Sequence, residues 1–353
     1  MILARRRAGG LPAGPARALR AHGGELTRGD RVFQVLSGIA ASLPMGALAF
    51  ILVVIVIYAF PAIVYNGTTF FTSTTFSFGN LYSGATVVHN GVAAPLGATY
   101  GALAFIVGTL TTSVIAIALA VPISVGGVLI LSEFVPRRLQ NVVSTFIELL
   151  AGIPSVVFGL WGLTVLGPFL SVHVYPALTG IGVVIPWFKG PVGSGQGLLT
   201  AAIVLAIMIV PIVASTTREL VRRVPVLAHE GALALGMTRY ETVRVVTIPY
   251  VRSGIIAASL LGWGRALGET MAVLLIIGNS YVLPHNIYAT TGTLAADIAG
   301  TLDGAFTDGT GMAVRGLAEL GVFLLLISLL TNLSGRLLVR RISGDALPVG
   351  RGV

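Results

Sequence analysis

Long runs of apolar residues limit the folds open to this chain more than any other feature. No charged side chain occurs between Arg31 and Glu133. A membrane-spanning helix needs about 20 mostly apolar residues. Six segments meet that requirement, near 36–61, 100–131, 142–170, 197–217, 253–278 and 313–335. Only 10% of the residues are charged, against about 25% in soluble domains. The sequence therefore predicts an all-α membrane protein with six transmembrane helices.

The distribution of basic residues gives an orientation. Nineteen of the 22 lie in the amino-terminal tail, in the connections after the second and fourth spans, and in the carboxyl-terminal tail. Because cytoplasmic connections carry the excess of Lys and Arg, we expect both termini in the cytoplasm. A basic chain can also bind nucleic acid, but 55% of these residues are hydrophobic, which argues against that function. We therefore expect no nucleic-acid partner and assign the arginines to contacts with membrane lipid.

The predicted spans and the distribution of basic residues divide the chain into four parts. We expect an Arg-rich cytoplasmic tail at 1–35, a first spanning helix with its outer loop at 36–99, a five-helix core at 100–340 and a second cytoplasmic tail at 341–353. The polar stretch 66–91 separates the first two spans and has the composition of a loop or a short strand.

The connection between the fourth and fifth spans is unusually long and predicts two short helices, which we call the elbow (residues 225–250). Gly236 suits the positive φ that ends a helix, and Thr238 with Glu241 forms a capping-box pattern. We expect Pro249 to stop the second helix before the fifth span. The predicted apolar face contains Leu233, Leu235, Met237, Val243 and Val246. This face either docks another protein or packs on the helices of its own chain.

Two charges inside the fifth span, Arg265 and Glu269, need a separate explanation. Arg265 lies 13 residues beyond Arg252, or about 20 Å along a helix, and a charge at that depth costs on the order of 3 kcal/mol. At a spacing of four residues the two side chains share one helical face and can meet. They form either a structural ion pair or part of a polar pathway.

The elbow resembles the EAA loop of ABC importer permeases. The matching residues are Glu230-Gly231-Ala232, Gly236 and the run Val246-Thr247-Ile248-Pro249, with Gly231 in place of the first alanine and Val246 and Ile248 in place of Ile and Leu. The resemblance implies the type I (MetI-like) fold with a coupling helix. It also implies that Glu230, Ala232, Gly236, Ile248 and Pro249 lie at an ATPase interface. The chain has no G-x-x-x-x-G-K-[ST] motif, so hydrolysis of Mg-ATP is expected on a separate subunit.

The run GRALGETMAVLLIIGN at 264–279 is similar to the permease subunits of ABC phosphate importers, PstC type, as are the segments near 100–127 and 147–162. The resemblance implies a bacterial inner-membrane protein in which Arg265 and Glu269 belong to the phosphate pathway. The implied partners are a PstA-like permease, two PstB-like ATPases and an external PstS-like binding protein. A guanidinium suits phosphate oxygens.

Two other function classes stay open at this point. One is a permease for another oxyanion, such as molybdate or sulfate. The other is a chain that works without an ATPase, as a secondary transporter or a membrane enzyme, although neither an internal repeat nor a convergent catalytic set is visible. The five histidines are scattered over different connections, so we expect neither a metal site nor a bound cofactor.

Overall fold

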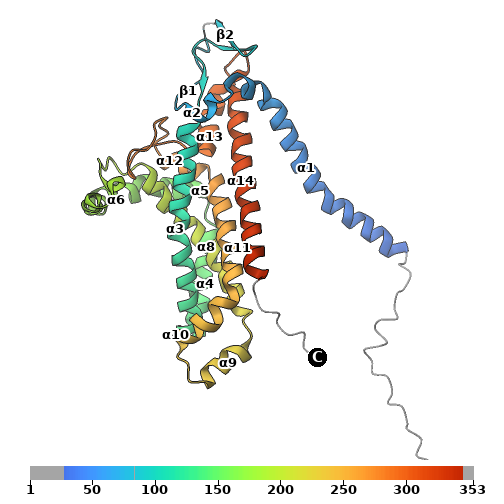
Figure 1. Cartoon of the computed structure of the whole chain (residues 1–353), viewed down its shortest axis with the longest axis vertical. Helices are drawn as coiled ribbons and strands as arrows, with labels where there is room; N and C mark the ends of the chain where they lie inside the picture. The colour runs from blue at the N-terminus through green and yellow to red at the C-terminus, as the bar shows by residue number, and fades with distance from the viewer. Residues whose placement is uncertain (1–27, 83, 345–353) are drawn as a thin grey trace, which may run out of the picture. The chain divides into compact units, whose positions relative to one another are not determined.

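The computed structural model describes residues 28–82 and 84–344. The predicted tails at 1–35 and 341–353 lie mostly outside this range. The chain forms two units, Met1–Val54 and Ile55–Val353, and the boundary falls inside the first helix, α1 (Arg28–Asn66). In the second unit, α3 (Leu103–Phe134), α8 (Leu198–Arg222), α11 (Ile248–Gly268) and α14 (Met312–Gly344) run side by side (Figure 1).

Six helices in the described part are long and apolar enough to span a membrane, which confirms the predicted number. The spans are Val32–Asn66, Leu103–Phe134, Ser155–His173, Leu198–Arg222, Arg239–Gly268 and Met312–Arg341. Small side chains let α3 and α8 pack closely, with Ala116 and Ala120 buried against Leu205 and Ile209. Tight packing of this kind fixes helix positions because membrane helices gain little from hydrophobic burial alone.

The predicted third span, 142–170, was wrong at its start. Residues Arg137–Ala151 form a separate helix, α4, and the chain bends at Gly152 and Pro154 before α5 (Ser155–Trp161). Proline disfavours a helical residue before it and lacks the N–H needed to continue a helix. From α5 the chain continues through a π-helical turn, η2 (Gly162–Leu166), into α6 (Gly167–His173), which projects sideways in Figure 1. The apolar run concealed this bend.

The outer end of the second unit combines short strands with two more helices. β1 (Phe76–Ser77) pairs with β4 (Thr99–Tyr100), and β2 (Thr86–His89) pairs with β3 (Val92–Pro95). The β2–β3 loop is Asn90-Gly91, and both residues have positive φ, as a type I′ hairpin requires. Phe76 of β1 packs edge to face on Tyr100 of β4 and on Phe105 in the first turn of α3. α2 (Thr69–Thr72) follows α1 in this region, which matches the loop-or-strand expectation only in part.

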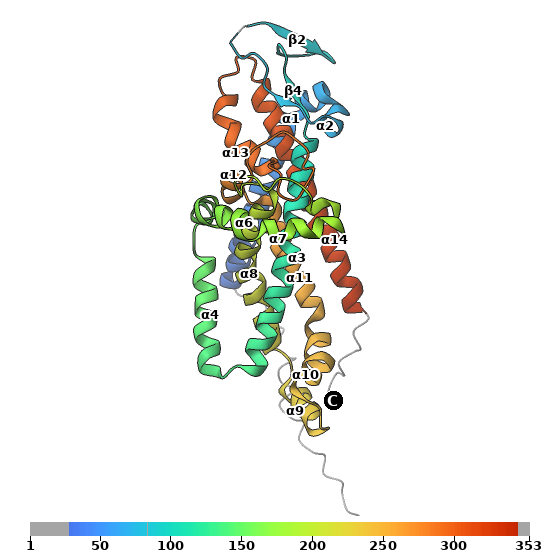
Figure 2. The ribbon, with the colours of Figure 1, turned by 90° about the vertical axis from the view of Figure 1, so that its left-hand side faces the viewer.

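Short helices form the remaining connections. α7 (Tyr175–Thr179), η3 (Gly180–Val183) and η4 (Pro186–Phe188) lie between α6 and α8. α12 (Met271–Ile276) and α13 (Leu294–Ala305) lie between α11 and α14. The elbow consists of α9 (Val226–Ala234) and α10 (Arg239–Thr242), and a π-helical segment, η5 (Val243–Thr247), leads from it to α11. In Figures 1 and 2 the elbow and the strands lie at opposite ends of the bundle.

Candidate functional site

The elbow has the local geometry that its sequence predicts. Gly236 has φ +84° and separates the two short helices. The Thr238 hydroxyl accepts a hydrogen bond from the Glu241 backbone N–H, and the Glu241 carboxylate accepts one from the Thr238 N–H at 2.7 Å. This reciprocal bonding satisfies two N–H groups that a helix start leaves free. Both predictions were confirmed because each depends only on residues within one turn.

Pro249 does not stop a helix, contrary to the prediction. It lies in the first turn of α11, and a single 30-residue helical segment runs from Arg239 to Gly268. The π-helical turn at η5 directly precedes it. A π turn shifts the hydrogen-bond pattern, so the missing N–H and the ring of a following proline are accommodated. The second elbow helix and the fifth span are therefore one mechanical element.

The apolar surface of the elbow differs from the predicted face. Leu233 and Leu235 are exposed as expected, but Val243 is buried and Met237 and Val246 are half-buried. Val226, Leu227 and Tyr240 are exposed and were not predicted. The helical spacing assumed one continuous face, whereas the turn at Gly236 presents residues of the two helices in different directions.

The predicted interface residues differ in accessibility. Glu230 and Gly236 are exposed, Ala232 is 6% exposed, and Ile248 and Pro249 lie exposed in the first turn of α11. Glu230 and Gly236 are thus available to a partner. Ala232 instead packs inside the elbow, where a larger side chain would not fit without displacing its neighbours.

Arg265 and Glu269 do not form the predicted pair. α11 ends at Gly268, and Glu269 has extended backbone angles of φ −70° and ψ 125°. Of the three ion pairs in the described part of the chain, none includes either residue. Glycine is a poor helix residue, and a helix that ends before Glu269 does not hold the two side chains on one face. The i,i+4 argument was wrong because it assumed that the helix continues.

Arg265 lies exposed on α11 while Glu269 is half-buried. Within residues 28–82 and 84–344 the Arg265 guanidinium has no hydrogen-bond or ion-pair partner. Arg265 is 26 residues beyond Arg239 in the same helical segment, or roughly 39 Å at 1.5 Å per residue. An unpaired charge near the end of a long helix that starts in the elbow is the most conspicuous chemical feature of this span.

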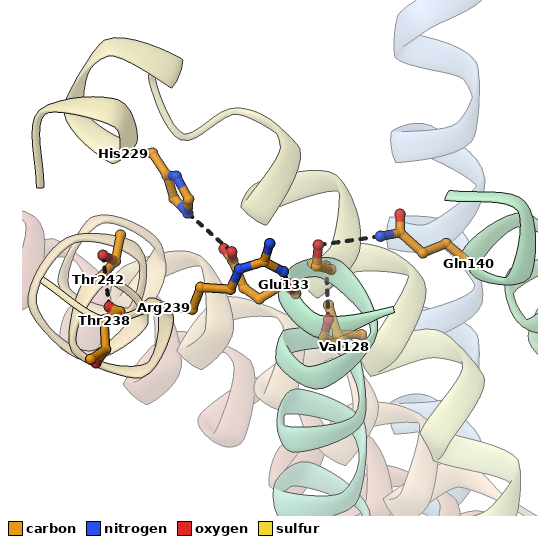
Figure 3. A network of polar contacts seen from close by, with 8 residues as sticks. Val128, Glu133, Gln140, His229, Thr238, Arg239 and Thr242 are labelled. Atoms are coloured by element: carbon orange, nitrogen blue, oxygen red, sulfur yellow. Dashed lines mark hydrogen bonds and ion pairs between the residues drawn. The ribbon is translucent and has the colours of Figure 1, made fainter. Parts of the chain in front are cut away.

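A network of polar contacts, shown in Figure 3, joins the elbow to the end of α3. The Glu133 carboxylate lies 3.0 Å from Nε2 of His229 in α9. The main-chain carbonyl of Glu133 accepts a hydrogen bond of 2.8 Å from Nη1 of Arg239 in α10. Gln140 in α4 donates to the carbonyls of Ser132 and Val135. Carbonyls at a helix end lack partners within the helix, so these side chains complete the end of α3.

Sequence reasoning missed the role of Glu133, although a signal was present. Glu133 is the first charged residue after an uncharged stretch that starts at Val32, and it falls at the end of the second span. Its partner His229 is 96 residues away. Local patterns carry no information about contacts at that separation, so the pairing is visible only in the fold.

A cavity of about 660 Å³ lies between the elbow and the bundle. Its walls come from the end of α3, the start of α4, the end of α8 and one side of α9. α9 packs on α10 and η5 and makes no extensive contact with α3, α4 or α8 in the described part of the chain. The His229–Glu133 contact is therefore important for holding α9 near the bundle.

Comparisons with known proteins identify the family. The profile described as "Binding-protein-dependent transport system inner membrane component" matches residues 123–344. The "Phosphate transport system permease protein PstC 1" of Mycobacterium tuberculosis is 52% identical over 337 residues, covering 94% of this chain and 99% of the relative. The PstC of Pasteurella multocida is 41% identical over 257 residues, covering 70% and 77%.

Solved structures agree on the fold. A bacterial alginate ABC transporter in complex with an alginate pentasaccharide-bound periplasmic protein aligns with a TM-score of 0.53 at 17% identity, covering 88% of this chain and 94% of that chain. At this identity the alignment shows a shared architecture only. The family consists of multi-pass inner-membrane transport components, not enzymes. The family profile matches more than half of the chain, and a PstC relative is 52% identical over nearly the full length. The chain therefore belongs to the binding-protein-dependent transport inner membrane components, in the branch of the PstC permeases.

Proposed function

We propose that this chain is one permease subunit of an ATP-driven phosphate importer. The observation that carries the proposal is the 52% identity to a phosphate permease over 94% of the chain. The subunit would pair with a PstA-like permease, rest on two PstB-like ATPases and receive phosphate from an external PstS-like binding protein. Mg-ATP would bind only to the ATPases, and both termini would be cytoplasmic, as the arginine distribution predicts.

The exposure of Arg265 supports a second permease beside α11. A guanidinium facing lipid at this depth costs on the order of 3 kcal/mol, and no partner for it is present in the described part of the chain. A polar route between two permease chains would remove that cost. Phosphate oxygens match the planar donors of a guanidinium, so Arg265 would attract the anion as it passes.

The interruption of α11 at Glu269 also fits a transport route. Residues Glu269 and Thr270 lie between α11 and α12 and have lost the helical hydrogen-bond pattern. Non-helical backbone at membrane depth is tolerated where protein or water surrounds it, and broken helices of this kind line substrate sites in transporters. Glu269 would then place a negative charge on the same route and weaken the retention of the anion, because transport requires release as well as binding.

The exposed surface of the elbow is an argument for ATP-driven movement. Exposed Glu230 and Gly236, together with exposed apolar side chains such as Leu227, form a surface suited to a cytoplasmic partner. The continuous segment from Arg239 to Gly268 would carry any displacement of α10 to the position of Arg265. Closure and reopening of the ATPase pair would in this way alternate access to the route.

The test is phosphate uptake by the assembled complex in proteoliposomes that contain the external binding protein. We expect uptake that requires ATP and the ATPase subunits and that excess sulfate or molybdate does not reduce. Uptake without the ATPases would favour a secondary transporter. Stronger competition by molybdate or sulfate than by unlabelled phosphate would favour a permease for another oxyanion.

A further inference from the structure

Glu133 lies where three parts of the chain meet, and its contacts differ in kind. Its side chain contacts α9 through His229, and its main-chain carbonyl contacts α10 through Arg239. The Glu133 side chain is only 12% exposed and that of His229 is 27% exposed, so water screens their interaction less than it screens a surface pair. One residue at the end of α3 thus contacts both helices of the elbow.

The elbow has few other attachments to the membrane helices. In the described part of the chain α9 packs mainly on α10 and η5, and the cavity of about 660 Å³ lies between it and the ends of α4 and α8. α10 continues covalently into α11. Movement of the elbow can therefore reach α11 through the backbone, but it can reach α3 through this cytoplasmic end mainly by way of Glu133.

α3 and α11 are also joined further along the bundle. Trp263 lies two residues before Arg265 in α11, and its Nε1 donates a hydrogen bond of 3.2 Å to the hydroxyl of Ser113 in α3. α3 in turn packs closely along α8. With attachments at Glu133 and at Ser113, α3 and α11 can shift as one body, and that shift would alter the surroundings of Arg265.

We propose that Glu133 is a positioning residue that transmits elbow movement to α3, so that ATP hydrolysis and phosphate movement remain coupled. This inference rests on the proposed function. Loss of the Glu133–His229 contact would leave the ATPase interface and the anion route intact but would let α9 move without α3, although Arg239 would still bind the Glu133 main-chain carbonyl. The expected defect is hydrolysis without transport, not a loss of either site.

The test measures phosphate transported per ATP hydrolysed in proteoliposomes, with assembly of every complex checked by co-purification. We expect Glu133→Ala and His229→Ala each to lower this ratio about five- to tenfold, a typical range for coupling between sites. The ATPase rate and its KM for ATP should change little. Since both variants remove one contact, the double variant should lose no more than the worse single variant.

The matched control is Glu219→Gln. Glu219 in the last turn of α8 pairs with Arg223, the residue that follows this helix, and both side chains are 67% exposed. The Glu219→Gln complex should transport as much phosphate per ATP hydrolysed as the wild type, because exposed ion pairs contribute little to stability. A lowered ratio in this control would show that any charge change near this surface has the same effect, and would overturn the proposal.

Chemical rescue separates transmission from mere stability. The chain has no cysteine of its own, so Glu133→Cys and His229→Cys would supply the only two thiols in this subunit, and a short bifunctional thiol reagent can join them. The reduced double-cysteine complex should be uncoupled, and cross-linking should raise the ratio again. Variants that assemble and keep the wild-type ratio before cross-linking would refute the role of Glu133. Failure of the wild-type complex to import phosphate would instead refute the proposed function.

Discussion

The replacement Asp297→Asn should make the stability of the protein fall less steeply between about pH 4 and pH 7. Asp297 lies in α13, is 5% exposed, and its Oδ2 has no hydrogen-bond partner. Burial raises the pKa of this carboxyl from 3.8 to about 7. The folded chain thus holds a proton that the unfolded chain releases near pH 4.

The sign and the size of the effect follow from that difference. A raised carboxyl pKa means that the stabilising protonated form is fully present below about pH 4, and that stability falls as the pH rises towards 7. A difference of about three pKa units at 1.36 kcal/mol each gives a loss of about 4 kcal/mol. An asparagine avoids the charge but buries an amide without an assured partner, which costs about 1–3 kcal/mol. The net gain above pH 7 should then be about 1–3 kcal/mol.

The assay is denaturant or thermal unfolding of the purified protein in one detergent from about pH 3 to about pH 8. Asp308→Asn is the matched control with the opposite sign. Burial favours protonation of Asp308, but hydrogen bonds from Ala313, Thr310 and Met312 outweigh it and lower the pKa of the carboxyl. Asp308 should therefore stabilise the protein above about pH 4 and lose that effect as the pH falls. A wild-type stability that rises between pH 4 and pH 7, with an unchanged slope in Asp297→Asn, would refute the burial argument.

Three further substitutions test individual elements. Gly236→Ala places a β-carbon on a residue with φ +84° and no atom within 4 Å, so backbone strain alone should destabilise the elbow turn by about 1–2 kcal/mol. Hydrogen exchange of the nearby backbone amides should become faster, and an unchanged exchange rate would contradict the turn geometry. Thr238→Ala should remove the capping box and destabilise the start of α10 by about 1 kcal/mol. Thr238→Ser should keep its backbone amides protected from hydrogen exchange, and equal exchange rates in the two variants would exclude the cap. Gly108→Ala places a β-carbon 2.0 Å from the Gly292 carbonyl oxygen, and overpacking costs about 1–3 kcal/mol or more. The thermal midpoint of Gly108→Ala should fall well below that of Gly126→Ala, whose β-carbon meets nothing within 4 Å. Equal midpoints would argue against the close approach of Gly292 to α3.

The features predicted correctly from the sequence depend on length, composition or a single helical turn. Six apolar runs indicated six spans because a bilayer sets a minimum length. The Gly236 turn and the Thr238 cap follow from side chains that act on their own backbone. Such features need no knowledge of the tertiary fold, and the structure confirms them.

The errors occurred where the tertiary structure interrupts or extends an apolar run. Hydropathy does not distinguish the bend at Gly152 and Pro154 from a straight helix, and it joined α11 to α12 across Glu269. The effect of Pro249 was also misjudged, because a π-helical turn compensates for proline in a way that residue types do not indicate. The Glu133–His229 contact depends on two segments that are distant along the chain.

The central claim is that phosphate passes Arg265, and uptake by assembled Arg265→Gln complexes tests it most directly. Arg252→Gln is the matched control, because Arg252 lies exposed in the same helix and loses the same charge. We predict that Arg265→Gln lowers phosphate uptake roughly tenfold or more, as loss of a charged hydrogen-bonding group implies, while Arg252→Gln transports normally. Normal uptake by Arg265→Gln at wild-type assembly levels would contradict the claim.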